Sequence, residues 1–343
     1  MPDLKKICLT PVMNEAWTLE RFLKCTSTWA DHIIVADQNS TDGSRDICAR
    51  FPKVTLVENP SKTFNEPERQ KLLLENARKI QGQRLLVALD ADEFLTANFV
   101  RSPEWQSMLN AKPGTCFKFH WVTVVNETAS YWIFPQRLTF AFMDDGSDHR
   151  GQAMHSPRLP ESMTGQSVNL NEIKILHYAY VDLRRAESKM HWYQCLENLN
   201  KLRRPIDTFR FNHKDITISA KMIRPLPEHW LNAYKESGID MTSIRLSDFY
   251  QWDQKVIELF KEHGAGRFSK LAIWDVDWNH LHAVIYGKPP EVLIQDPRTM
   301  LEKAVHAWLK RTQPYYSQYG PKPKAFRKFY FRLVNKLLKY LGW

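Results

Sequence analysis

Two aspartates separated by one residue follow the most apolar stretch of the sequence. Arg84–Leu89 has the composition of a buried strand, and Asp90-Ala91-Asp92-Glu93 follows it directly. Side chains at i and i+2 of an extended segment point to the same side, so we expect Asp90 and Asp92 to face one ligand. Carboxylate oxygens suit Mg²⁺ or Mn²⁺, and such an ion can bridge a diphosphate. The alternative for a single D-x-D pair is a pair of acids that merely caps the next helix.

A second polar segment, Asp37–Ser44, follows the apolar run His32–Ala36. A carboxylate at Asp37 can accept a hydrogen bond from a base N–H group or from a ribose hydroxyl. Asn39 is a candidate for contact with the nucleoside. The alternative is an ordinary turn that starts the following helix, because Asp, Asn and Ser are the residues such turns prefer.

The elements that must position these residues alternate in type over the first hundred residues. We expect strands at Ile7–Met13, His32–Ala36, Val54–Val57 and Arg84–Leu89. We expect the helices between them at Asn14–Cys25, Arg45–Arg50 and Glu68–Ile80. Continuous apolar strands that alternate with helices predict an α/β fold, with a mostly parallel sheet and helices on both faces. Ligands of such sheets bind at the carboxyl ends of the strands, so both acidic segments are expected at one edge.

The pattern changes after residue 115. We expect aromatic-rich strands at Phe117–Val125 and Tyr131–Phe142, followed by a polar loop region at 143–171. A strand at Ile173–Tyr180 and a helix at Arg184–Leu202 come next. We expect Pro205–Pro227 to be irregular and 228–312 to be mainly helical. The corresponding domains are 1–225, with halves 1–115 and 116–225, a helical extension at 226–320 and a tail at 321–343.

Composition narrows the class of protein. The 343 residues are 43% hydrophobic and 25% charged, as in an ordinary globular protein, which excludes a disordered or collagen-like chain. The sequence has no run of eighteen apolar residues, which excludes a many-pass membrane protein. Five cysteines without a C-x-x-C pair indicate a reducing compartment, and the expected location is the cytoplasm.

The excess positive charge lies in the C-terminal tail. Residues 322–343 contain seven Lys or Arg and no acid, within a net charge of +10. On a helical projection Phe326, Phe329, Leu333 and Leu337 share one side, which is typical of a helix at a membrane interface. We expect contact with an anionic membrane surface and no nucleic-acid binding. The alternative is a terminal helix packed on its own protein.

Three of these segments together resemble family 2 glycosyltransferases, namely Thr10-Pro11-Val12-Met13-Asn14-Glu15, Ile33–Ser44 and Leu89–Glu93. The resemblance implies the Rossmann-like GT-A fold and a nucleotide-sugar donor, most often a UDP-sugar. It also implies roles for individual residues. Pro11, Asn14 and Glu15 would line the nucleoside site, Asp37 would hold the base, Asp90 would face the sugar or ribose, Asp92 would ligate the metal, and Arg69 would lie near the diphosphate.

The second half resembles the family more loosely. Ile175-Leu176-His177-Tyr178 is similar to a family segment, and neutral His177 at the end of a strand is a candidate to complete the metal shell. Gly151–His155 is similar to another family segment, although Ser156 replaces the acid found there. An inverting transfer needs one base for the acceptor hydroxyl. The candidates are Asp144, Asp145, Asp148 and Glu161, of which Asp145 is preferred.

The sequence therefore predicts a hexosyltransferase of polysaccharide biosynthesis, peripheral on the cytoplasmic face of the plasma membrane. Its cofactor would be Mn²⁺ or Mg²⁺, and its acceptor a glycan or glycolipid of bacterial surface polysaccharide assembly. Two alternatives stay open. One is a GT-A-like sugar nucleotidyltransferase, and the other is a non-catalytic, membrane-associated binding module. By contrast, Asp275, Asp277, His280 and His282 are expected to belong to a packed helical region and not to a metal site.

Overall fold

The chain divides into two compact units. The computed structural model describes residues 3–61, 65–151, 156–160, 166–213, 220–244, 246–317 and 320–343. Unit 1 comprises Met1–Val181 and Pro225–Arg245, and unit 2 comprises Asp182–Arg224 and Leu246–Trp343. The division therefore falls at residue 181 and not at the expected boundary near 225, and the segment 225–245 returns to unit 1.

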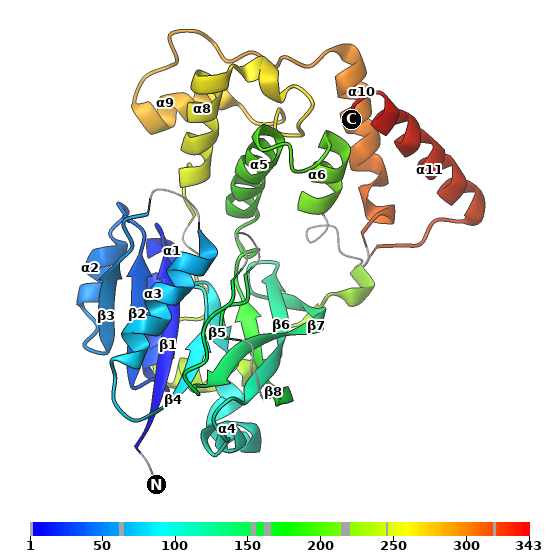
Figure 1. Cartoon of the computed structure of the whole chain (residues 1–343). Helices are drawn as coiled ribbons and strands as arrows, with labels where there is room; N and C mark the ends of the chain where they lie inside the picture. The colour runs from blue at the N-terminus through cyan, green and yellow to red at the C-terminus, as the bar shows by residue number, and fades with distance from the viewer. Residues whose placement is uncertain are drawn as a thin grey trace. The chain divides into compact units, whose positions relative to one another are not determined.

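Unit 1 contains the sheet (Figure 1). Its strands are β1 (Leu4–Val12), β2 (His32–Asp37), β3 (Val54–Glu58), β4 (Gln83–Ala88), β5 (Glu93–Leu95), β6 (Cys116–Val125), β7 (Ser130–Met143), β8 (Ser167–His177) and β9 (Arg224–Pro225). Its helices are α1 (Ala16–Ser27), α2 (Ser44–Ala49), α3 (Glu66–Arg78), α4 (Pro103–Leu109) and α7 (Asn232–Glu236), with 3₁₀ turns at Ala97–Arg101 and Glu228–Trp230.

The strand order is β3-β2-β1-β4-β7-β6-β8-β5, with β9 paired to β7. The first four strands are parallel, as expected, and the register sets Val12 opposite Asp37. β7 is antiparallel to both β4 and β6, while β6 and β8 are parallel. The sheet is therefore mixed, and the α/β, Rossmann-like fold that the sequence predicts is confirmed. Because β1, β2 and β4 are parallel, their carboxyl ends lie at one edge of the sheet.

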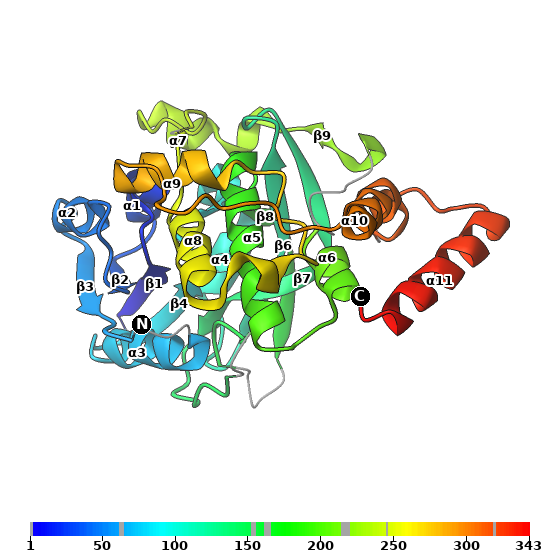
Figure 2. The same ribbon diagram turned by 90° about the horizontal axis from the view of Figure 1, so that it is seen from above.

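Helices cover both faces of the parallel strands, because alternate strand residues are apolar in both directions. Cys8, Ile33 and Val87 pack with Phe22 of α1 in one core. Their neighbours along the strands, such as Ile34 and Leu86, pack against α3 in a second core. Figure 2 shows the same strands from above.

Unit 2 is helical. Its helices are α5 (Leu183–Leu199), α6 (Pro205–Asn212), α8 (Gln251–His263), α9 (Trp278–Tyr286), α10 (Met300–Thr312) and α11 (Ala325–Tyr340), with 3₁₀ turns at Ala220–Met222, Ala265–Phe268 and Gln313–Tyr315. One apolar core joins α5, α8 and α9, and a second joins α6, α10 and α11. The expectation of an irregular segment from Pro205 was wrong for α6, because this proline occupies the first turn of the helix, where its missing N–H group costs nothing.

Candidate active site

Two loops at the carboxyl ends of β1 and β2 are joined by hydrogen bonds. The Asn14 N–H group donates to Ser40 Oγ at 2.9 Å, and the Thr41 N–H group donates to Asn14 Oδ1 at 2.7 Å. The Glu15 N–H group donates to Ser44 Oγ at 3.0 Å. Asn14 and Asn39 both have positive φ, of 56° and 53°, a backbone conformation that Asn adopts more readily than most residues. These contacts fix the loops that the sequence predicts to hold a nucleoside.

Asp37 ends β2 beneath these loops and is only 1% exposed. Its Oδ2 atom accepts from Arg45 at 3.0 Å and from the Ser40 N–H group at 3.3 Å. Its Oδ1 atom is buried and has no hydrogen-bond partner among the residues that the structure describes. A buried charged acceptor without a partner is costly, and such groups often await a ligand. Arg45 was not singled out from the sequence.

The other residues expected at the nucleoside site lie in the same region. Pro11 pairs with Ala36 in the β1–β2 register, next to the pair Val12–Asp37. Glu15 precedes α1, and its Oε2 atom accepts from Trp17 Nε1 at 2.6 Å. Asn39 is exposed at the loop surface. The structure therefore brings these residues together at one end of β1 and β2.

The acidic segment after β4 is a turn and not an extended strand. The Glu93 N–H group donates to the Asp90 carbonyl oxygen at 2.9 Å, and the Asp90 N–H group donates to Glu93 Oε2 at 2.8 Å. The expectation that Asp90 and Asp92 face one ligand because the segment is extended was therefore wrong. The Asp90 side chain is 44% exposed, whereas the whole Asp92 residue is 8% exposed.

Arg158 organises this turn. It contacts Asp90 Oδ2 at 2.9 Å and both carboxylate oxygens of Glu93, one of them at 3.0 Å, and its guanidinium lies 5.0 Å from the Phe140 ring centre. Glu93 is fully buried, and burial raises its pKa to about 7 against the opposing effect of Arg158. Burial alone would lower the pKa of Arg158. The carboxylates of Asp90 and Glu93 outweigh this effect and hold the pKa above its ordinary value.

Asp92 lies beside His177, the last residue of β8. Glu93 and His177 are partners in the β5–β8 register, which places His177 Nε2 3.9 Å from Asp92 Oδ2. The His177 ring stacks on Trp121, with ring centres 4.3 Å apart and planes 27° from parallel. Tyr180 meets the same imidazole edge-on. The structure thus brings together the two residues that the sequence analysis selected as metal ligands.

A pocket of about 770 Å³ opens beside the acidic turn. Its polar wall includes Arg69, Asp90 and Arg158, and its apolar wall includes Trp121 and Phe140. Asp92 and His177 are not among its lining residues, although Trp121 connects the His177 ring to it. Charged groups on one side and aromatic rings on the other suit a ligand that combines phosphates with sugar rings.

Asp145, the expected base, does not lie with this group. β7 runs antiparallel to β4, so its end reaches the start of β4, where the Asp144 N–H group donates to the Arg84 carbonyl. Asp90 lies six positions after Arg84 along the extended chain of β4 and Leu89, which corresponds to about 20 Å. Asp145 is exposed, and its Oδ1 atom accepts from the Ser147 N–H group. The geometry therefore gives no support to Asp145 as the base.

The remaining candidates differ in environment. Asp144 is buried and forms ion pairs with Arg78 and Arg84. Burial alone would raise the pKa of Asp144, but the two arginines hold it below the ordinary value. Asp148 is exposed. Glu161 and most of the segment 151–155 lie outside the described residues.

The donor set fits a divalent cation only in part. Among the residues that the structure describes, no group of three or more His, Cys, Asp or Glu side chains could hold a metal ion. Asp92 and His177 supply one carboxylate and one imidazole, separated by a distance that a single ion can span. A cation at this pair would have to complete its shell with oxygens from a ligand and from water.

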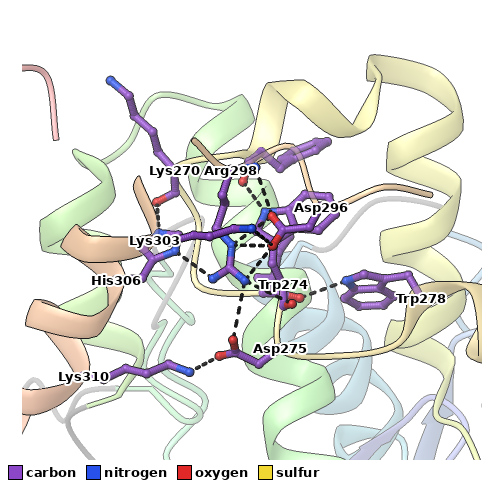
Figure 3. Close-up of polar contacts among 11 residues, drawn as sticks. Lys270, Trp274, Asp275, Trp278, Asp296, Arg298, Lys303, His306 and Lys310 are labelled. Atoms are coloured by element: carbon purple, nitrogen blue, oxygen red, sulfur yellow. Dashed lines mark hydrogen bonds and ion pairs between the residues drawn. The ribbon is translucent and has the colours of Figure 1, made fainter. Parts of the chain in front are cut away.

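The acids that the sequence analysis excluded in unit 2 have structural partners. Asp275 pairs with Lys310 and with Arg298, and Asp296 pairs with Arg298 at 2.9 Å and with Lys303 (Figure 3). The Asp277 carboxylate accepts from two backbone N–H groups at the start of α9. His282 contacts the Lys288 carbonyl. These contacts are ordinary structural ones within a helical region.

The family model described as "Glycosyl transferase family 2" matches residues 8–102, which include β1 to β4 and the acidic turn. The match covers less than a third of the chain. The matched segment contains the nucleoside loops, Asp37 and the Asp90–Asp92 turn, so the resemblance inferred from three short segments is confirmed. No curated protein matches the chain.

Several solved structures are similar to parts of the chain. Glucosyl-3-phosphoglycerate synthase from Mycobacterium tuberculosis, in complex with Mn²⁺, UDP and phosphoglyceric acid, is 19% identical, with a TM-score of 0.27. The match covers 34% of this chain and 43% of that chain. A 4-diphosphocytidyl-2C-methyl-D-erythritol synthase is 12% identical, also with a TM-score of 0.27, and the match covers 75% of this chain and 98% of that chain. Likenesses at this level carry no information about activity.

Proposed function

We propose that this protein transfers a sugar from a nucleotide-sugar donor, specifically a UDP-sugar, to a glycan or glycolipid acceptor. The reaction would be metal-assisted and would invert the anomeric carbon, as a hexosyltransferase of surface polysaccharide biosynthesis does. One observation carries the proposal: the segment that matches the family brings the buried Asp37 and the Asp90–Asp92 turn to one edge of the sheet.

The nucleoside half of the donor fits the loops after β1 and β2. The unpaired Oδ1 atom of Asp37 accepts a hydrogen bond from the base, and the imide N–H group of uracil has the matching polarity. Arg45 forms an ion pair with the other carboxylate oxygen of Asp37, so the carboxylate keeps one orientation. Arg69, in the wall of the neighbouring pocket, supplies positive charge for the diphosphate.

Asp92 and His177 would hold the divalent cation. When bound, the cation acts as a Lewis acid that neutralises charge on the leaving diphosphate. The chain's own contribution is to fix the two ligands: the β5–β8 register positions His177, and the Trp121 ring restricts its imidazole. Arg158 holds the Asp90–Glu93 turn in one conformation.

The base for the acceptor hydroxyl is assigned in this proposal to a carboxylate of the pocket. Glu66 and Asp90 line the pocket, whereas Asp145 does not. If either acts as the base, its amide variant, Glu66→Gln or Asp90→Asn, slows transfer by a factor of about 100 to 10,000. Asp145→Asn serves as the matched control and should keep the wild-type rate. The reverse pattern would restore Asp145 as the base.

Product analysis tests the proposal against its alternatives. Incubated with a panel of UDP-sugars and Mn²⁺, the protein should release UDP and require the metal. A sugar nucleotidyltransferase would instead release pyrophosphate from a nucleoside triphosphate and a sugar phosphate. A binding module would release neither product. Pyrophosphate release, or no turnover with any donor, would refute the assignment.

We further propose that the enzyme is peripheral on the cytoplasmic face of a membrane and that α11 makes the contact. No helix within the described ranges is long and apolar enough to cross a bilayer. One edge of α11 packs on its own unit through Leu338, with Trp343 just beyond the helix. A separate stripe remains exposed, with Phe326, Phe329, Leu333, Leu337 and Tyr340 between 55% and 88% exposed. The helix thus packs on the protein and still presents an apolar face beside basic residues, which suits an anionic interface.

Point variants test this contact better than deletion of the tail, because deletion would also remove the buried Leu338 and Trp343. The triple variant Phe329→Ser, Leu333→Ser and Leu337→Ser should lower pelleting with anionic vesicles by about tenfold or more, given roughly 25 cal/mol per Å² of apolar area. The control carries Ser at three other apolar positions of unit 2 that are also more than half exposed, Val292, Leu293 and Met300. Equal pelleting of both variants would contradict the proposal.

A further inference from the structure

Unit 2 contains a pocket of about 570 Å³ that the proposed transfer reaction does not use. Ten residues line it, and five of them are cations while none is an acid. The cations come from the end of α5, the start of α6 and the segment before α9: Lys201, Arg203, Arg204, Arg267 and Lys270. Five like charges around one cavity repel one another unless an anion lies between them.

Two of the cations are held in place by neighbouring groups. Arg203 contacts Glu197 at 2.5 Å, and its guanidinium lies 3.8 Å from the Phe211 ring centre. Lys270 Nζ donates to the Gly342 carbonyl at 3.1 Å and lies 5.7 Å from the Trp343 ring centre. These contacts reduce the side-chain entropy that binding of an anion would otherwise remove.

The other three cations are exposed and lack an ion-pair partner within the described part of the chain. They are Lys201, Arg204 and Arg267. Lys201 follows α5 with a φ of 52°, in the left-handed region where glycine usually ends a helix. A lysine there costs backbone energy that a glycine would not, and it adds a charge to the rim of the pocket.

The acids near the pocket do not neutralise it. Glu197 is nearly buried and engages Arg203, while Glu302 accepts from Ser269 and from the start of α10. Neither carboxylate lines the cavity. Among the described residues, no carboxylate lies within ion-pair distance of Lys201, Arg204, Arg267 or Lys270. Four such cations around one space suit a multiply charged oxyanion.

We propose that this pocket is a binding site for a phosphate-ester anion, of the phosphomonoester or diphosphate class. Arginine guanidinium groups at Arg204 and Arg267 would bind the oxygens in pairs, while Lys201 and Lys270 add point charge. The pocket also lies where α11 ends, since Gly342 forms part of its wall. Two sources share this chemistry, namely a lipid headgroup at a membrane that α11 contacts and a soluble phosphate ester.

Calorimetric titration of the full chain with pyrophosphate, in the absence of divalent cations, tests the site. The double variant Arg204→Ala/Arg267→Ala should bind pyrophosphate at least about tenfold more weakly than the wild type. The matched control, Lys288→Ala/Arg311→Ala, removes the same charge from exposed positions of unit 2 outside the pocket and should change the affinity less than about twofold. Equal weakening in both variants, or no binding to the wild type, would overturn the proposal.

Vesicles distinguish the two sources. Phosphatidylcholine vesicles that contain phosphatidic acid present a phosphomonoester, and phosphatidylglycerol at matched surface charge does not. A lipid ligand predicts that the pocket variant loses binding to phosphatidic acid vesicles more than the control, and that pyrophosphate competes. A soluble ligand predicts equal vesicle binding by both variants while the difference in pyrophosphate affinity persists. UDP binding in the presence of Mn²⁺ should be unchanged in the pocket variant, so failure of this proposal leaves the transferase proposal intact.

Discussion

Acidic residues cluster in both units, and their partners differ. In unit 2, Asp275 and Asp296 each contact two cations, and Arg298 at the centre is only 10% exposed (Figure 3). In unit 1, Asp92 has a histidine as its only ion-pair neighbour among the described residues, and Asp37 keeps an unpaired, buried oxygen. Acids whose charge is matched inside the protein stabilise the fold, whereas acids with unmatched, oriented oxygens can bind a ligand.

The unit 1 turn itself contains both kinds of acid. Glu93 is fully buried and forms an ion pair with Arg158, whereas its neighbour Asp92 forms no ion pair with Lys or Arg in the described part of the chain. The structural pair of Glu93 and Arg158 therefore lies directly beside Asp92, the candidate ligand-binding residue. The pair stabilises the backbone turn that contains Asp92. This difference can be tested by substituting matched and unmatched acids in parallel.

The largest expected effect follows from the unmatched acid. Asp92→Ala should lower metal-dependent UDP release by at least about 1,000-fold, because loss of a metal ligand removes several kcal/mol of transition-state stabilisation. Asp275→Ala, which removes a matched acid of unit 2, should leave the rate within about twofold. Steady-state assays of both variants make the comparison, and similar rates for the two would remove the distinction.

The next effect follows from the matched pair. Arg158→Met should lower the free energy of unfolding by about 3 kcal/mol, because it leaves the buried Glu93 without its partner. Adding Glu93→Gln should restore much of that loss, since no buried charge then remains unpaired. Lys24→Met, which breaks the surface pair with Glu20, should cost less than about 0.5 kcal/mol. Urea titrations measure all three, and an Arg158 variant as stable as the wild type would contradict the role given to this pair.

The smallest effect concerns pH and the network of unit 2. His306 Nε2 lies 3.1 Å from the Lys270 carbonyl and Nδ1 lies 3.2 Å from an Arg298 nitrogen, so the ring donates to the first and accepts from the second. Burial, with Arg298 nearby, holds the pKa of His306 below its ordinary value. Below about pH 6.5 the His306 ring binds a proton in the unfolded chain but stays neutral in the folded protein. The free energy of unfolding therefore falls on acidification, by at most about 1.4 kcal/mol per pH unit.

The variant His306→Gln should flatten this dependence, since an amide does not titrate. Denaturant titrations of wild type and variant between pH 7 and pH 5 measure the difference. A wild-type profile that is parallel to that of the variant would show that His306 does not contribute to the pH dependence.

The sequence was informative where apolar runs are continuous. β1 to β4 lie within three residues of their expected bounds. β1, β2 and β4 are central strands with continuous buried apolar segments, which the sequence reveals directly. β8 begins at Ser167 and not at Ile173. Its first six residues are mostly polar and exposed, with only Leu170 buried, so they lack the continuous apolar run that marks the other strands. Unit 2 takes in α5 and α6, which no composition change near residue 182 indicates.

The candidate site was predictable only within short segments. Asp37 is the last residue of β2 and Asp92 lies in the turn after β4, so their position at the sheet edge follows from local pattern alone. Arg158 meets Glu93 from 65 residues away, and no spacing rule connects them. Asp145 was chosen from its turn composition, but the antiparallel direction of β7, which sequence did not reveal, takes it to the opposite end of β4.

Binding of UDP with and without Mn²⁺ tests the central claim most directly, that a carboxylate at this sheet edge holds a cation for the diphosphate. Calorimetry should show that Mn²⁺ tightens UDP binding to the wild type by about tenfold or more, and that the metal has no effect on the Asp92→Ala variant. Two results would contradict the account. One is a wild-type affinity for UDP that is the same with and without Mn²⁺, and the other is an Asp92→Ala variant whose affinity for UDP still rises with Mn²⁺.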